Sequence, residues 1–441
     1  MGASDLDLFD RLESEVRSYS RDFPTVFRTA SGSRMTDEAG RSYLDFFAGA
    51  GTLNYGHNPA ELKHALIDYL VGDGITHGLD LATSAKRRLI ERFQAAILAP
   101  RGLSYKMQFP GPTGANAVEA ALKLARKATG RSGIVAFTNG FHGVTQGAVA
   151  VTGNAKYRRF PGHQRGDVAF LPYDGWLGET VDTVEVAARY LDDPASGIDA
   201  PAAFLVETVQ GEGGVNVASA DWLRRLADLA RRHGSLIIVD DIQVGCGRTG
   251  AFFSFERAGV EPDIVTLSKS LSGFGLPLAM VLMRPDLDVW RPGEHNGTFR
   301  GNNLAFVTAA EAIDRFWSDG TFADTVASRG ATMRQRLEAM AARANTRLSD
   351  GPAVSVRGLG MIQGLDLGDG ERASAVCRAA FERGLIIETS GARGQVVKCL
   401  PPLTTEAADL AAGLDVLEAA LDAVLGEAAA ADSPARAEPV A

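Results

Sequence analysis

Short apolar runs alternate with amphipathic stretches along most of the chain. The apolar runs are typical of strands buried on both faces, and they occupy residues 106–109, 133–137, 168–171, 203–207, 235–239, 264–267 and 279–283. Intervening stretches such as 117–129 and 221–233 carry apolar residues at helical spacing. This alternation predicts an α/β fold whose large domain is built on an open, mostly parallel sheet.

The two ends of the chain follow a different pattern. Residues 5–19 predict a short amphipathic helix, and an acidic turn within 35–45 predicts a hairpin. Elements expected near the other end are a helix over 324–344, strands within 354–367 and at 385–389, and a helix over 405–425. We expect a large domain at 61–325, a smaller α+β domain made of 1–60 and 326–425, and a disordered, alanine-rich tail at 426–441.

Charge and composition narrow the possible partners. The 441 residues include 45 basic and 54 acidic ones, which gives a net charge of -9, and no basic cluster is present to attract a nucleic acid or an anionic membrane. The chain has no run near the roughly 20 apolar residues of a membrane span, and residues 1–19 lack the apolar core of a signal peptide. We therefore expect a cytoplasmic protein without nucleic-acid or membrane partners.

The first candidate for chemistry is Lys269, which follows the apolar run 264–267 and precedes a glycine-rich stretch. Strands of parallel sheets present catalytic groups at their carboxyl ends. An amine among apolar and hydroxyl neighbours loses hydration, which lowers its pKa and favours attack on a carbonyl. Lys269 is therefore a candidate Schiff-base lysine, and an ordinary surface lysine is the alternative.

A second candidate is the acidic pair Asp240 and Asp241, directly after the apolar run 235–239. Two carboxylates at that position are costly unless a positive group meets them, and a protonated pyridine nitrogen is one such group. Solvated acids at the start of a loop are the alternative. A magnesium site would also use two aspartates, but no glycine-rich loop ending in Lys-Ser or Lys-Thr accompanies the pair.

Two further segments have the composition of a cofactor site. Residues 109–116 lead into the helix at 117–129, so glycine, backbone amides and a helix amino end could hold a phosphate; a routine helix cap is the alternative. Phe141 could stack on a planar ring or simply belong to the core. His142 has no second histidine at metal-ligand spacing, and three scattered cysteines suggest neither a zinc site nor a disulfide framework, so we expect no metal.

Five motifs occur in an order that makes the chain recognisable. They are ETVQGEGG at 207–214, DDIQ at 240–243, GRTG at 247–250, SK at 268–269 and GTFRGN at 297–302. In this order they resemble the class III pyridoxal-phosphate aminotransferases. Segments 13–19, 139–143 and 293–298 are similar to the branch of that family that makes diaminobutyrate for ectoine synthesis. The resemblance covers residues 13–425.

The resemblance implies pyridoxal phosphate fold type I and a role for each matching residue. Lys269 would bind the cofactor covalently and move the substrate proton, and Asp240 would pair with the pyridinium. Other residues assigned to the cofactor are Thr113, Gly114, Ala115, Asn116, Phe141, His142, Gln243 and Thr298. Ala115 stands where relatives often carry a hydroxyl, which Thr113 or Asn116 could replace. Thr298 would reach the phosphate of a neighbouring subunit, so at least a homodimer is expected.

The resemblance also implies the substrates. Glu207, Glu212 and Lys398 would lie near them, with Lys398 where related enzymes bind the α-carboxylate by arginine and Glu212 as the group that covers it. A lysine offers a point charge instead of a two-pronged clamp; a solvated strand residue is the alternative. The expected reaction converts L-aspartate 4-semialdehyde and L-glutamate to L-2,4-diaminobutyrate and 2-oxoglutarate. The alternatives are another ω-aminotransferase, of ornithine, acetylornithine or 4-aminobutyrate type, and a regulatory protein that binds the cofactor without turnover.

Overall fold

A seven-stranded sheet forms the centre of the larger part of the molecule. The computed structural model describes residues 6–162, 166–348 and 352–431. In spatial order the strands are β4 (Lys106–Gln108), β12 (Met280–Met283), β11 (Ile264–Leu267), β10 (Leu236–Asp240), β7 (Ala203–Val206), β5 (Ile134–Phe137) and β6 (Val168–Leu171). Only β12 runs antiparallel to its neighbours within this sheet, which confirms the predicted mostly parallel arrangement.

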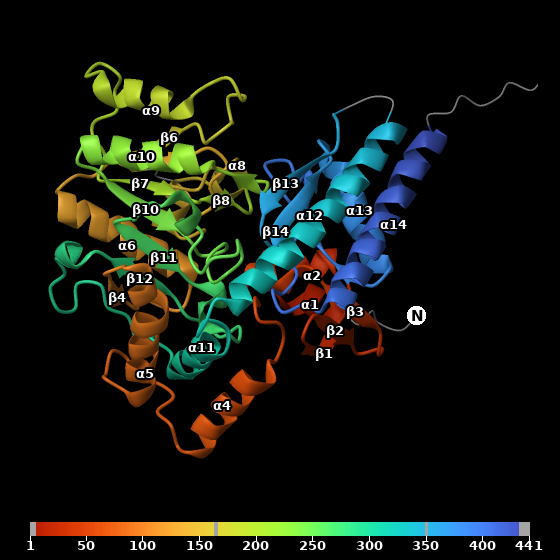
Figure 1. Cartoon of the computed structure of the whole chain (residues 1–441), viewed down its shortest axis with the longest axis horizontal. Helices are drawn as coiled ribbons and strands as arrows, with labels where there is room; N and C mark the ends of the chain where they lie inside the picture. The colour runs from red at the N-terminus through yellow and green to blue at the C-terminus, as the bar shows by residue number, and fades with distance from the viewer. Residues whose placement is uncertain (1–5, 163–165, 349–351, 432–441) are drawn as a thin grey trace, which may run out of the picture.

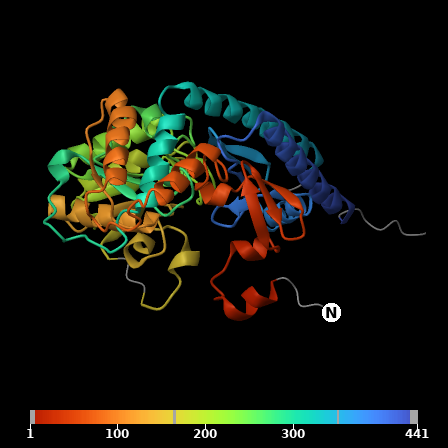
Figure 2. The ribbon, with the colours of Figure 1, turned by 90° about the horizontal axis from the view of Figure 1, so that it is seen from below.

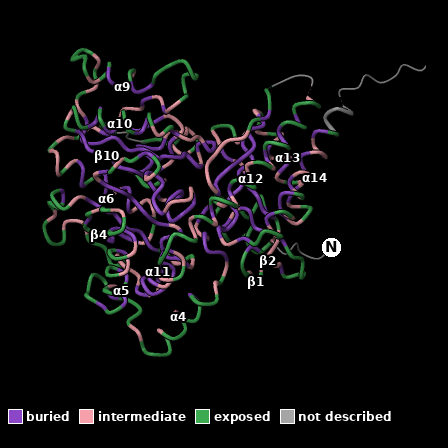
Figure 3. Tube along the Cα trace, viewed as in Figure 1, coloured by how far each residue is buried: buried purple, intermediate pink, exposed green. Residues whose placement is uncertain are grey.

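Both faces of this sheet are covered, and the strand residues alternate between two cores. Val135 and Phe137 of β5 belong to one core, whereas Ile134 and Ala136 belong to the other. Figure 3 shows buried residues running through the strands and exposed residues on the outer turns. This two-sided burial explains why the strands have continuous apolar sequences.

Helices cover the sheet. Those of the larger part are α4 (Ala60–Val71), α5 (Ser84–Arg92), α6 (Gly114–Thr129), α7 (Gln146–Ala150), α8 (Ala155–Arg158), α9 (Thr183–Asp192), α10 (Ala220–Arg232) and α11 (Asn303–Phe316). Residues of α6 lie in one core, and residues of α5, α9, α10 and α11 lie in the other. A two-stranded ribbon of β8 (Val209–Gln210) and β9 (Asn216–Val217) completes this part. None of the described helices is long and apolar enough to span a membrane.

The smaller part of the molecule combines both ends of the chain (Figures 1 and 2). One sheet contains β1 (Phe27–Ser31), β2 (Arg34–Asp37), β3 (Ser42–Asp45) and β15 (Leu385–Ile386); the other contains β13 (Ser355–Leu359), β14 (Ile362–Asp366), β17 (Val396–Cys399) and β16 (Glu388–Ser390). Long helices α12 (Thr321–Arg347), α13 (Gly370–Glu382) and α14 (Ala407–Ala431) cover them. Leu44 and Phe46 share one core with residues of these helices.

Three segments differ from the expected elements. The helix expected at 5–19 is broken into α1 (Asp7–Leu12) and α2 (Tyr19–Asp22), and its apolar residues Leu12 and Val16 are exposed because none of the described residues covers them. The strand β17 was not predicted. Helix α14 continues to Ala431, since alanine favours helix, and residues 432–441 of the expected tail lie outside the described residues.

The packing of α12 gives a test of the fold. Gly330 lies in α12, where a Cβ would stand 2.7 Å from the Gly360 carbonyl oxygen. We expect Gly330→Ala to lower the free energy of unfolding by about 1–3 kcal/mol, the usual effect of overpacking. Gly426 in α14 has open space around its Cβ position, so Gly426→Ala should instead gain up to about 1 kcal/mol of helix propensity. Urea unfolding of both variants measures the difference, and equal effects would contradict this packing.

Candidate active site

A cavity of about 180 Å³ lies at the carboxyl ends of β7, β10 and β11. Ligands of open parallel sheets bind at this edge. The cavity is lined by Gly114, Ala115, Phe141, His142, Gly143, Glu207, Val209, Glu212, Asp240, Ile242, Gln243, Val244 and Lys269. The structure therefore brings together nine of the residues that the sequence singled out, from Gly114 to Lys269.

Lys269 begins a short 3-10 helix after β11 and has a left-handed φ of 48°. A non-glycine residue in this region costs roughly 1–3 kcal/mol and is often found at functional sites. Its Nζ donates a hydrogen bond of 3.0 Å to the carbonyl oxygen of Ala50. Burial lowers the pKa of Lys269, although the carboxylate of Glu212 acts in the opposite direction. Lys269 therefore loses its proton more readily than an ordinary lysine, as an amine nucleophile requires.

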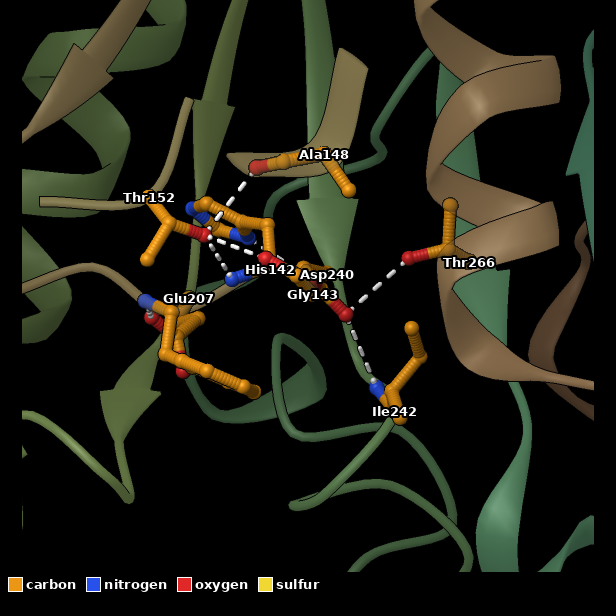
Figure 4. Close-up of polar contacts among 9 residues, drawn as sticks. His142, Gly143, Ala148, Thr152, Glu207, Asp240, Ile242 and Thr266 are labelled. Atoms are coloured by element: carbon orange, nitrogen blue, oxygen red, sulfur yellow. Dashed lines mark hydrogen bonds and ion pairs between the residues drawn. The ribbon is translucent and has the colours of Figure 1, made fainter. Parts of the chain in front are cut away.

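Asp240 is the last residue of β10, and three groups hold its carboxylate (Figure 4). Oδ2 lies 2.7 Å from Nδ1 of His142, while Oδ1 accepts hydrogen bonds from Thr266 Oγ1 at 3.1 Å and from the Ile242 backbone at 3.2 Å. The side chain is only 4% exposed. Because each carboxylate oxygen has two lone pairs, this carboxylate can accept a further donor inside the cavity.

His142 fixes the orientation of Asp240 and is itself fixed. Its backbone N–H donates to Thr152 Oγ1 at 3.0 Å, and Thr152 in turn donates to the carbonyl oxygens of Gly143 and Ala148 (Figure 4). Burial alone would lower the pKa of His142, but the hydrogen bond to Asp240 and the nearby carboxylate of that residue raise it overall. A protonated His142 would neutralise part of the charge on Asp240. His142 therefore both lines the cavity and contacts Asp240, and its expected role in cofactor binding stays a prediction.

Glu207 follows β7 and is almost fully buried beside the same group of residues. Burial and the carboxylate of Asp240 raise the pKa of Glu207 to about 8, against the lowering effect of His142. One carboxylate oxygen accepts a hydrogen bond of 3.0 Å from the Phe141 backbone. At neutral pH Glu207 is therefore largely protonated, so it can act as a hydrogen-bond donor.

The amino end of α6 approaches the cavity through Gly114 and Ala115. A Cβ at Gly114 would stand 3.0 Å from Ile242 Cδ1, so glycine allows this close approach. Backbone amides at a helix start are donors for anions. Thr113 and Asn116 do not line the cavity: Thr113 Oγ1 donates to Asn116 Oδ1 at 2.9 Å within a capping box. The expected replacement of the missing Ala115 hydroxyl by Thr113 or Asn116 therefore stays a prediction.

Gln243 connects the cavity to its surroundings. Its Nε2 donates to the Ala50 carbonyl oxygen and to Glu212 Oε1, both at 3.0 Å. Its Oε1 is buried and has no partner among the described residues. A buried acceptor without a partner is costly, so a ligand hydroxyl at this point would satisfy it.

Lys398 lies beyond Glu212, away from the cavity wall. Its side chain is fully buried, and Nζ lies 2.6 Å from Glu212 Oε1 and 2.9 Å from Glu388 Oε1. The two carboxylates raise the pKa of Lys398 despite its burial, and Lys398 is the main cause that lowers the pKa of Glu212 to about 2 against the effect of burial. Lys398 is therefore a paired cation inside the protein and not a solvated strand residue.

Thr298 is the one predicted site residue that lies apart in the single chain. It is exposed in the segment between β12 and α11 and does not line the cavity. Its expected role concerns a neighbouring subunit, so that role stays a prediction.

Sequence reasoning missed two groups that complete this region. The Ala50 carbonyl oxygen accepts hydrogen bonds from Lys269 and Gln243. The only feature of the sequence that pointed to it was a segment rich in small residues at 48–56. Glu388 pairs with Lys398, and the signal was a glutamate next to the apolar residues of 385–387, where a charge needs a partner.

Comparison with known proteins identifies similar chains. The sequence model of the family described as aminotransferase class-III matches residues 16–421. The chain is 56% identical over 424 residues to a diaminobutyrate–2-oxoglutarate transaminase of Bordetella parapertussis, with 96% of each chain covered. It is 57% identical to the enzyme of the same name from Halomonas elongata, covering 93% of this chain and 97% of that one. The solved ornithine aminotransferase of Toxoplasma gondii is 28% identical, with a TM-score of 0.81 over 95% of this chain and 94% of that one.

The cavity has the groups that pyridoxal phosphate, the cofactor of class III aminotransferases, requires. An amine of lowered pKa, a buried carboxylate, a glutamine side chain and a helix amino end all line one space. These match the aldehyde, the ring nitrogen, the ring hydroxyl and the phosphate of that cofactor. The residues present therefore fit the cofactor, with Lys269, Asp240, Gln243 and Gly114 as its expected contacts.

Proposed function

Because the chain belongs to the class III aminotransferases, we propose that it transfers the α-amino group of L-glutamate to the terminal carbon of L-aspartate 4-semialdehyde. The products are L-2,4-diaminobutyrate and 2-oxoglutarate. The observation that carries this proposal is the identity of 55–57%, over nearly the whole chain, to relatives named diaminobutyrate–2-oxoglutarate transaminase.

The site residues support a division of labour. Bound pyridoxal phosphate supplies an electron sink for the negative charge that develops at the substrate carbon. Lys269 Nζ takes the proton from that carbon and returns it elsewhere, which its lowered pKa favours. Asp240 presents its carboxylate to the cavity, where it would pair with the pyridinium of the cofactor. His142 keeps the Asp240 carboxylate oriented. The amino group stays in the site between two half-reactions, so the kinetics are ping-pong.

Two substrates of different shape must use one site in turn, and Glu212 and Lys398 support a switch between them. Glu212 covers the Lys398 ammonium at 2.6 Å when the substrate presents no carboxylate there. When glutamate binds, its α-carboxylate takes the place of Glu212. The side chain of Glu212 is 19% exposed and borders the cavity, so it has room to move, whereas Lys398 is fully buried.

We expect Lys398→Ala to raise the glutamate concentration needed for the first half-reaction by roughly 10–100-fold, since a charged contact is lost. The half-reaction with L-2,4-diaminobutyrate should change less, because that substrate does not use Lys398. Stopped-flow absorbance of the bound cofactor measures both. Lys398→Arg, which keeps the charge, is the control. An unchanged glutamate half-reaction in the alanine variant would rule out the switch.

An assay with purified substrates tests the function itself. The holoenzyme is mixed with L-glutamate and each of several acceptors, and the products are identified by mass spectrometry. L-aspartate 4-semialdehyde should give the highest kcat/KM. The similarity to an ornithine aminotransferase favours, as a second candidate, an enzyme of ornithine type, and preference for glutamate 5-semialdehyde would decide for it. Absence of any half-reaction with glutamate would leave only a regulatory cofactor-binding protein.

We further infer a cytoplasmic homodimer. The exposed Thr298 and the absent hydroxyl at Ala115 support a phosphate contact supplied by a second subunit. The apolar side chains of Leu79, Leu81 and Phe299, which are 46%, 62% and 67% exposed, support a surface covered by another copy. Light scattering of the purified protein tests the dimer, and a monomer with full activity would refute it.

A further inference from the structure

Lys398 is held by two carboxylates that differ in mobility. Glu388 stands directly opposite Lys398 in the antiparallel pair β16–β17, and it is 7% exposed. Glu212 lies between β8 and β9, where its side chain is 19% exposed and borders two cavities. One partner of Lys398 is therefore part of a sheet, and the other belongs to a turn.

Removal of Glu212 from Lys398 would be costly if Glu212 were its only partner. A buried ammonium without a counter-ion loses hydration and gains nothing in return. Glu388 Oε1, 2.9 Å from Nζ, keeps an oxygen beside the ammonium at that moment, while the incoming carboxylate of glutamate supplies the negative charge. It also limits where Nζ can lie, which matters because a lysine side chain has four rotatable bonds and no rigid fork.

Resting on the proposed function, we propose that Glu388 is a positioning residue that holds Lys398 in place for the α-carboxylate of glutamate, so that Glu212 alone moves. In this assignment Lys398 and Glu388 are the fixed half of the switch. A lysine with a second carboxylate then provides the directed contact that an arginine would provide by its own shape.

The protonation of Glu388 is compatible with this role. Burial and the carboxylate of Glu212 raise the pKa of Glu388 to about 7, against the lowering effect of Lys398. Glu388 Oε1 lies 2.9 Å from Lys398 Nζ without a hydrogen bond of regular geometry, and both the protonated and the ionised side chain have an oxygen that can lie there. The length of the Glu388 side chain, which sets how far its oxygen reaches toward Lys398, should therefore matter more than its charge.

Three variants separate reach from charge in the holoenzyme. Glu388→Gln keeps the reach without the charge, Glu388→Asp keeps the charge but withdraws the oxygen by one methylene, and Glu388→Ala removes both. We expect the Glu388→Asp and Glu388→Ala variants to raise the apparent dissociation constant for glutamate about tenfold or more in the first half-reaction. The Glu388→Gln variant should keep this constant within about threefold of the wild-type value. All three should leave the half-reaction with L-2,4-diaminobutyrate within about threefold.

Other outcomes overturn the assignment. If Glu388→Gln binds glutamate more weakly while Glu388→Asp binds it normally, charge is the decisive property of Glu388. Equal losses in both half-reactions would indicate general damage to the fold, and no loss in Asp or Ala would remove Glu388 from the switch. If Glu388→Ala does not fold, the comparison of Asp with Gln still decides. A wild-type enzyme that reacts with glutamate but not with aspartate semialdehyde would refute the proposed function and leave the glutamate comparison valid.

Discussion

Replacing Lys269 with alanine should lower the turnover of the transaminase reaction by about 10⁴-fold, the upper end of what one positioned proton-transfer group contributes. Two properties of Lys269 explain the size of the effect. Its Nζ is the amine of the cavity, and burial lowers its pKa, so one residue serves both cofactor binding and proton transfer. Steady-state product formation measures the loss, and a variant that turns over at the wild-type rate would refute the proposed mechanism.

A control and a rescue make this result specific. Lys156→Ala removes an exposed lysine that lines the neighbouring cavity at Tyr157 and Glu212, and it should reduce turnover only a few-fold. Methylamine added to the Lys269→Ala variant should restore part of the activity, because a small free amine can enter the space left by the side chain and accept the proton. Lack of rescue together with loss of bound cofactor would indicate that Lys269 acts only in binding.

Asp240→Asn is expected to have the second largest effect, about a 10²-fold loss of kcat. A hydrogen bond to a charged group contributes up to roughly 3 kcal/mol, which corresponds to about two factors of ten. Asparagine keeps the size and one oxygen, so Thr266 and Ile242 retain an acceptor while the negative charge disappears. The loss should appear in kcat more than in the binding of glutamate, and stopped-flow rates of both half-reactions measure it.

Asp241 provides a matched control for that variant. It is the adjacent buried carboxylate, but its oxygens accept hydrogen bonds from Ser254, and it does not line the cavity. Asp241→Asn should therefore change stability more than kcat. Equal losses of kcat at both positions would show that the effect comes from the local fold and not from a charge facing the cavity.

The sequence predicted the central sheet well because its strands carry a local signal. The strands at 168–171 and 264–267 have the predicted bounds, since each is a short, mostly apolar run that begins after an aspartate and ends before a proline or a serine. Strand β17 lacked that signal, because Lys398 interrupts its apolar residues and is buried through pairing with Glu212 and Glu388. Burial of that kind depends on a second segment and cannot be found from one segment alone.

The candidate site shows the same limit. Lys269 and Asp240 could be found because each follows an apolar strand, and the sheet brings those strand ends together. Thr113 and Asn116 had the right residue types, but their side chains bond each other at the start of α6. The contribution of Ala50 comes from a carbonyl oxygen, and a backbone atom has no residue-type signature.

The pairing of β3 with β15 has a consequence for synthesis of the chain. It pairs Leu44 with Leu385, so β3 stays without this neighbour until β15 has been synthesised. Until then, the edge of β3 that will receive β15 has unpaired backbone groups, which favour association with other chains. Contacts this distant in sequence also slow folding. Strand β3 is thus complete long before its partner is made, and a nascent chain stalled before residue 385 would be prone to aggregate.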